Sequence, residues 1–151
     1  MLNIYIDADA CPVKKEIYRV ADRFKLKSIL VSNAAFSIPD NSLIRSVVVD
    51  DSPDAADNWI AQNAGEGDIV VTADILLAKR SLEKGSGVIS PAGKLFTEDN
   101  IGQLIASRNL MADLREAGEI FGGPPPFKKK DRSNFLHRLD ELIHSIIKKY
   151  S

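Results

Sequence analysis

The chain has 151 residues, 44% of them hydrophobic, which is enough for one folded domain with one substantial core. Its 20 basic residues are balanced by 21 acidic ones, so the net charge of -1 excludes a general attraction to nucleic acid, and any polyanion site must be local. The single cysteine, Cys11, excludes an internal disulfide and a thiolate zinc cluster. Because the sequence has neither a signal-peptide pattern nor about 18 consecutive apolar residues, we expect a cytoplasmic protein without membrane association.

The first fifty residues alternate strand and helix patterns. Ile4–Ile6 are strand formers without polar alternation, which indicates a central parallel strand buried on both faces. Pro12 fits the first turn of the next helix, where its missing N–H is not needed, and apolar residues recur at helical spacing from Val13 to Phe24. The pattern then predicts a strand at 28–32, a loop at 33–44 and a third strand at 46–49.

The middle of the chain repeats this order. Ser52-Pro53-Asp54 predicts a helix start, with a capping residue, a proline and an acid in the first turn. A fourth buried strand is expected at 68–72, followed by a helix at 75–83, a short fifth strand at 88–90 and a turn at 91–93. Strands that alternate with helices indicate βαβ units and a mostly parallel sheet.

The last third is predicted to be helical. Its first helix, at about 98–118, ends at Gly118. Its apolar side is formed by Ile101, Leu104, Ile105, Met111 and Leu114. Residues 122–130 are typical of a stiff, basic, exposed loop, and a final helix at about 131–150 should pack on the α/β body. We therefore predict one three-layer α/β domain over residues 1–151, with a mostly parallel sheet of about five strands and two extra C-terminal helices.

Four carboxylates follow the carboxyl ends of the predicted strands. Asp7 and Asp9 come after the first strand, Asp57 lies in the first turns of the helix after the third, and Asp74 follows the fourth. Ligands bind open α/β sheets at this edge, and the four side chains converge if the first and fourth strands are neighbours. Clustered carboxylates without histidine or cysteine suit Mg²⁺ or Mn²⁺, which can activate water for phosphodiester cleavage. The alternative is that these residues only cap helices.

Several basic residues are candidates for phosphate binding. Lys14 follows the acidic turn, and Arg108 and Arg115 fall within the apolar face of their helix, where a guanidinium needs an anion or a route to solvent. The alternative for both arginines is an internal ion pair with the acidic residues. Lys128 begins a lysine run that either contacts a nucleic-acid backbone or forms a solvated loop. Cys11 is predicted to be a small packed residue because cysteine is commonly buried, and the acids beside it oppose formation of a reactive thiolate.

Several motifs resemble the YaiI/YqxD family of uncharacterised bacterial proteins along nearly the whole chain. They are Asp7-Ala8-Asp9-Ala10-Cys11-Pro12-Val13-Lys14, Gly67-Asp68-Ile69-Val70-Val71-Thr72-Ala73-Asp74 with Leu77-Ala78, Asn100-Ile101 with Arg108 and Arg115, and Asp131-Arg132 with Phe135. That family is grouped with PIN-like domains, whose members are largely Mg²⁺- or Mn²⁺-dependent ribonucleases. The resemblance implies a PIN-like fold in which Asp7, Asp57 and Asp74 match the metal-binding acids.

The chain departs from the PIN pattern at one acid. PIN nucleases usually carry another acid on an intervening helix, whereas residues 33–50 of this chain predict only loop and strand. The candidates to replace that acid are Asp9, Asp50, Asp51 and Asp54.

These observations predict a Mg²⁺- or Mn²⁺-dependent nuclease, with RNA as the expected nucleic acid. In this hypothesis the metal ligands and catalytic residues are Asp7, Asp9, Asp57 and Asp74, and the phosphate-binding residues are Lys14, Arg108, Arg115 and Lys128. One alternative is a PIN-like module that binds nucleic acid or a nucleotide without catalysis.

A lesser alternative is a phosphatase. Asp7-Ala8-Asp9 also resembles the first motif of haloacid-dehalogenase-type phosphatases, with Asp7 as nucleophile, Asp9 as acid and Ser32 as phosphate binder. Asp68 and Asp74 lie at opposite ends of one predicted strand, so they cannot jointly hold the single Mg²⁺ of such an enzyme.

Overall fold

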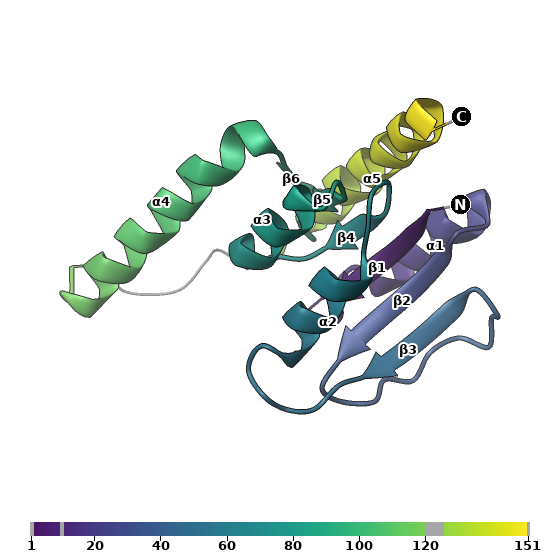
Figure 1. Ribbon diagram of the computed structural model, residues 1–151, viewed down its shortest axis with the longest axis horizontal. Helices are drawn as coiled ribbons and strands as arrows, with labels where there is room; N and C mark the ends of the chain where they lie inside the picture. Colours follow the sequence, from purple (N-terminus) through teal and green to yellow (C-terminus); the bar gives the residue numbers. More distant parts are fainter. Residues whose placement is uncertain (1, 10, 120–125, 151) are drawn as a thin grey trace.

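The structure is a computed structural model that describes residues 2–9, 11–119 and 126–150. Its described residues form one six-stranded sheet in the order β3-β2-β1-β4-β5-β6 (Figure 1). The strands are β1 (Asn3–Asp7), β2 (Lys27–Ser32), β3 (Ile44–Val48), β4 (Ile69–Val71), β5 (Gly87–Ile89) and β6 (Leu95–Phe96). β1 to β5 are parallel, and β6 pairs with β5 in the antiparallel sense.

Helices cover both faces of this sheet and complete the predicted three-layer α/β architecture. They are α1 (Lys14–Phe24), α2 (Ala55–Asn63), α3 (Ile75–Glu83), α4 (Glu98–Glu116) and α5 (Lys129–Tyr150). α1 and α5 lie on one face, and α2 and α3 lie on the other (Figure 1). No helix within the described ranges combines the length and apolar character that a membrane crossing requires.

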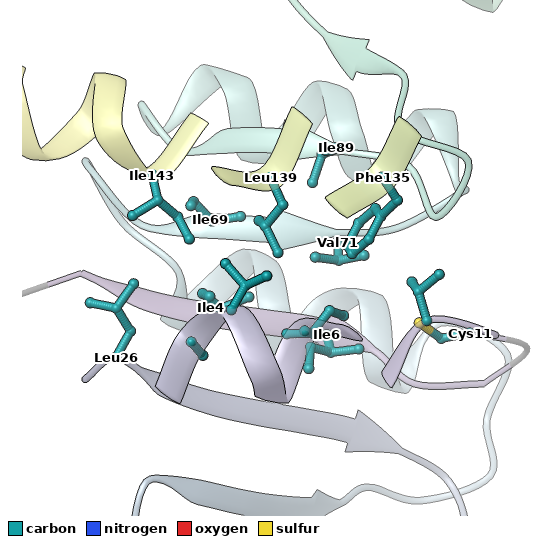
Figure 2. Close-up of a cluster of buried hydrophobic side chains, with 14 of the residues drawn as sticks. Ile4, Ile6, Cys11, Leu26, Ile69, Val71, Ile89, Phe135, Leu139 and Ile143 are labelled. Carbon is teal, nitrogen blue, oxygen red and sulfur yellow. The ribbon is translucent and has the colours of Figure 1, made fainter. Parts of the chain in front are cut away.

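Side-chain alternation along the central strands divides the core into two clusters. Ile4 and Ile6 of β1 point toward α1 and α5, where they meet three fully buried side chains of α5 (Figure 2). Those side chains are Phe135, Leu139 and Ile143, which confirms that the final helix packs on the α/β body. Tyr5 points to the opposite face, toward α2 and α3. Because neighbours alternate along a strand, Asp7 also faces the α2 and α3 side.

α4 differs from the other helices because it extends away from the sheet (Figure 1). It packs mainly against α3, and Ile101 in its first turn is its one buried residue. Ile101, Leu104 and Ile105 of its predicted apolar side pack against the core cluster that contains Tyr5, whereas Met111, farther along the helix, is 37% exposed. The C-terminal part of α4 extends beyond the sheet and the other helices, so they do not cover it (Figure 1). Gly118, with a φ of 75°, ends α4 as predicted.

Three local predictions are wrong in detail. α1 begins at Lys14, so Pro12 lies in the turn before the helix rather than in its first turn. α2 begins at Ala55 and Ser52 does not cap it, because the Ser52 N–H and hydroxyl both donate to Oδ1 of Asp50, at 2.9 and 2.6 Å. The prediction also missed β6, whose two residues are too few to give a pattern.

Candidate active site

The candidate site lies where the order of the sheet reverses. β2 and β3 follow β1 on one side, and β4 and β5 lie on the other, so the carboxyl ends of β1 and β4 form the switch point at which open α/β sheets bind ligands. Asp7 is the last residue of β1, and its Oδ2 accepts a 2.9 Å hydrogen bond from the Thr72 hydroxyl after β4. The same hydroxyl oxygen accepts the N–H of Asp74 at 3.0 Å. Thr72 therefore ties Asp7 to Asp74.

Thr72 is the residue that sequence reasoning missed. Thr72 is 1% exposed, and its hydroxyl group forms two hydrogen bonds, one with the Asp7 carboxylate and one with the Asp74 N–H. A threonine two residues before an aspartate at a strand end is the signal that could have identified it, since such hydroxyls commonly bond backbone two residues on.

Asp74 and Asp57 approach each other from two helices. Asp74 is the N-cap of α3, and its Oδ1 accepts the N–H groups of Leu76 and Leu77 at 2.9 and 3.2 Å. Asp57 lies in the first turn of α2. Burial, the charge of Asp74 and a hydrogen bond between the two carboxyl groups raise the pKa of Asp57 to about 7. Weaker repulsion comes from Asp7 and Asp54.

Asp7 is perturbed in the same direction. Burial raises its pKa, the Thr72 hydrogen bond lowers it, and the charges of Asp74 and Asp9 raise it further. Asp7, Asp57 and Asp74, called here the acidic centre, therefore repel one another, and no ion pair between described residues involves any of them. This is the electrostatic setting that a bound cation or a shared proton relieves.

The donor set of the acidic centre fits a hard divalent cation in chemistry. All three side chains offer carboxylate oxygens, which Mg²⁺ and Mn²⁺ prefer. One oxygen of Asp7 accepts the Thr72 hydroxyl, and Oδ1 of Asp74 accepts the N–H groups of Leu76 and Leu77. Within residues 2–9, 11–119 and 126–150, no three histidine, cysteine, aspartate or glutamate side chains are already close enough to hold a metal ion together.

Asp9 diverges from the acidic centre. Its Oδ1 accepts a 2.7 Å hydrogen bond from the hydroxyl of Ser32, which ends β2 on the face occupied by Leu30 and α1. Asp9 is exposed, and it is the weakest of the charges acting on Asp7. Of the acids proposed to complete a PIN-like set, Asp54 is the one that acts on Asp57, whereas Asp50 and Asp51 are exposed in the preceding loop.

Both predicted arginines lie beside Asp74. Arg108 and Arg115 of α4 line a cavity of about 560 Å³ together with Asp74 and Met111, referred to below as the arginine cavity. Neither arginine has a carboxylate within salt-bridge distance among the described residues, so the predicted internal ion pair is absent there. Two guanidinium groups beside carboxylates can hold a phosphate that the acidic residues alone would repel.

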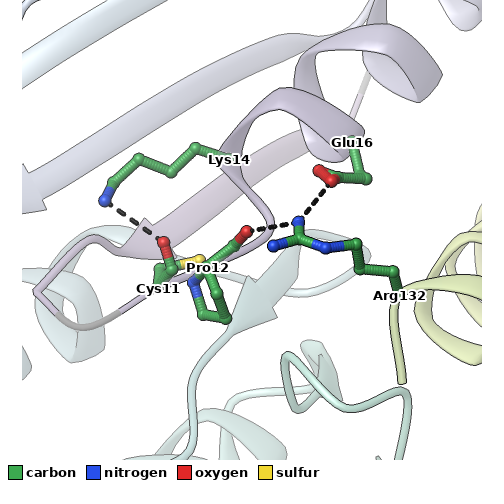
Figure 3. A network of polar contacts seen from close by, with 5 residues as sticks. All are labelled: Cys11, Pro12, Lys14, Glu16 and Arg132. Atoms are coloured by element: carbon green, nitrogen blue, oxygen red, sulfur yellow. Dashed lines mark hydrogen bonds and ion pairs between the residues drawn. The ribbon is translucent and has the colours of Figure 1, made fainter. Parts of the chain in front are cut away.

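The two predicted lysines lie elsewhere. Lys14 donates from Nζ to the Cys11 carbonyl at 3.2 Å (Figure 3). Its ammonium group also lies over the Phe36 ring. Its cavity, of about 490 Å³, does not include Asp74. Lys128 is exposed before α5, and its N–H donates to Oδ2 of Asp131. Residues 120–125, which include part of the predicted basic loop at 122–130, lie outside the described residues.

Arg132 of α5 holds the turn that follows the acidic strand end. It donates to the Pro12 carbonyl at 2.8 Å and to Oε1 of Glu16 at 2.6 Å (Figure 3). Cys11, in the same turn, is 7% exposed, and burial raises the pKa of its thiol. The prediction of a packed cysteine is confirmed, and the raised pKa disfavours the thiolate.

The raised pKa of Asp57 predicts how stability depends on pH. Its folded-state pKa of about 7 exceeds the ordinary value of 3.8, so the folded protein binds this proton more tightly than the unfolded chain. The stabilisation is complete below the ordinary pKa and is lost as the pH rises through about 7. Urea titrations in EDTA should show the free energy of unfolding falling across this window, and Asp57→Asn should reduce the fall. An unchanged pH dependence in Asp57→Asn would contradict the assignment.

Comparison with known proteins adds family relationships. The chain matches the family described as "Uncharacterized BCR, YaiI/YqxD family" over residues 5–145. A UPF0178 protein of Rhodospirillum rubrum is 51% identical over 146 residues, covering 96% of this chain and 97% of that protein. A UPF0178 protein of Azorhizobium caulinodans is 55% identical over 142 residues, covering 94% and 89%, respectively. No solved structure matches the chain.

Proposed function

The chain belongs to the YaiI/YqxD family of uncharacterised bacterial proteins, and from that premise we propose that it is a Mg²⁺- or Mn²⁺-dependent phosphodiesterase of PIN-like type that acts on nucleic acid, with RNA as the expected substrate. The observation that supports this most is the acidic centre at the switch point between β1 and β4. Three carboxylates from separate elements act electrostatically on one another there, and burial together with this repulsion raises the pKa of Asp7 and Asp57.

Each residue has a defined role in this proposal. Asp7, Asp57 and Asp74 would hold the cation, which when bound supplies a nucleophilic water and neutralises charge on the reacting phosphate. Thr72 orients Asp7 and the Asp74 backbone. The N–H groups at the start of α3 orient Asp74. Arg108 and Arg115 bind the phosphate from the α4 side. Asp9, predicted as a metal ligand, lies outside this centre, and Lys14 and Lys128 remain proposed contacts for the strand.

A metal titration tests the proposal directly. Mn²⁺ should raise the melting temperature of the wild type, because a ligand that binds only the folded state stabilises it. The same titration on Asp7→Asn should give a smaller rise. Mn²⁺-dependent hydrolysis of bis(p-nitrophenyl) phosphate and of single-stranded RNA should accompany the shift. If Mn²⁺ stabilises the wild type no more than Asp7→Asn, the proposed metal site is wrong.

A second candidate function is nucleic-acid binding without catalysis. It is favoured by one observation: no three potential ligands within the described residues are already arranged to hold a metal. RNA binding without Mn²⁺-dependent turnover would favour this alternative. The phosphatase alternative is less supported, because the Ser32 hydroxyl that would bind phosphate instead donates to Asp9 and accepts the N–H of Ala34. Turnover of p-nitrophenyl phosphate that is lost in Asp7→Asn would support it.

A further inference from the structure

A second cavity adjoins the arginine cavity. It measures about 380 Å³ and is walled by Pro12, Ile75, Pro91, Phe96, Leu104 and Phe127. It shares Ala73, Ile75 and Leu104 with the arginine cavity. The two cavities therefore adjoin each other, and Asp74, the residue between Ala73 and Ile75 in the chain, lines the arginine cavity. A ligand that occupies one can extend into the other across these shared residues.

The walls of this second cavity define what it can bind. Ring and aliphatic side chains surround it, and its size lies within the range of about 300–1,000 Å³ usual for small organic ligands. Polar groups are few: Ser90, whose Oγ accepts the N–H of Lys94 and can still donate its proton, and the exposed Lys94. A flat ring with two apolar faces and a hydrogen-bonding edge matches these walls. Nucleobases have that form and stack on aromatic side chains.

The neighbouring charges favour a nucleotide over an uncharged ring. Arg108 and Arg115 lie one cavity away, where neither pairs with a described carboxylate, so they are positioned for anionic phosphates. The apolar cavity thus adjoins a cavity lined by two arginines and Asp74, as a base-binding site beside a phosphate-binding site would. We propose that the apolar cavity binds one unpaired nucleobase of single-stranded nucleic acid. A base in a duplex cannot enter without being extruded.

This inference rests on the proposed function only in taking RNA as the ligand. Base binding does not require the metal ion, so the test measures RNA binding in its absence. Fluorescence anisotropy in EDTA compares a labelled single-stranded oligoribonucleotide, its duplex and the same strand with abasic positions. The single strand should bind at least about tenfold more tightly than either, as expected for base stacking. Ala92→Trp, in the exposed turn at the cavity, and Phe127→Ala should each remove most of that difference.

Two controls make the result specific. Tyr150→Ala removes an exposed aromatic at the far end of α5 and should leave the preference unchanged. Arg108→Ala should weaken the binding of all three ligands and reduce its salt dependence, since it removes a phosphate contact. Equal affinity for the three ligands, or an unchanged preference in Ala92→Trp, would overturn the base site. Hydrolysis of bis(p-nitrophenyl) phosphate together with equal affinities would retain the proposed function and overturn only this inference.

Discussion

Asp74→Asn is expected to reduce Mn²⁺-dependent phosphodiester hydrolysis by more than about 100-fold, because changes even to groups that only support a metal ligand cost about 10–100-fold. The fold should survive. Asparagine caps a helix as well as aspartate does, so the hydrogen bonds to Leu76 and Leu77 can be kept. Initial rates at saturating Mn²⁺ and a urea titration measure the two effects.

The charge change itself needs a control. Asp40→Asn makes the same substitution in the exposed loop before β3 and should leave both rate and stability unchanged. Without metal, Asp74→Asn should be at least as stable as the wild type, because it removes the main repulsive charge on Asp57 and so lowers the pKa of that residue. Activity within tenfold of the wild type would show that Asp74 is not a metal ligand.

Ile143→Ala is expected to lower the free energy of unfolding by about 2–5 kcal/mol, the usual cost of emptying a buried isoleucine site. Ile143 is 0% exposed and packs between α5 and the sheet (Figure 2). Ile147→Ala is the matched control: it is the same change one turn along α5, at a side chain that is 38% exposed. Its cost should stay below about 1 kcal/mol. Equal losses in the two variants would mean that α5 does not dock as described.

Most elements could be predicted from local pattern. Continuous apolar runs predict β1 and β4 as strands buried on both faces, and the helix at 75–83 has the bounds predicted for it. Local hydrogen bonding explains the errors. Ser52 donates hydrogen bonds to Asp50, which precedes it, and does not cap α2, which follows it. Both partners are close in the chain, and residue type alone does not determine which of them a serine binds.

The residues of the acidic centre could be predicted from the sequence, but the positions of their side chains could not. Parallel strands end at one edge of a sheet, so Asp7 and Asp74 could be expected there once β1 and β4 were assumed to be neighbours. Their pairing confirms that assumption. Side-chain alternation holds only while the chain stays extended, so the spacing of Asp7 and Asp9 did not by itself place both on one face, and here Asp9 turns to Ser32 on the other face.

By itself, the sequence determined the local features of this protein: which segments are strands or helices, where acids follow strands, and that Cys11 is packed. These depend on spacing and residue type over a few positions. Tertiary structure alone decided that Thr72 joins Asp7 to Asp74, that burial and repulsion raise the pKa of Asp57, and that α4 leaves the body to set two arginines beside the acids. Those features depend on distances between residues far apart in the chain, which only the packing of the sheet and helices defines.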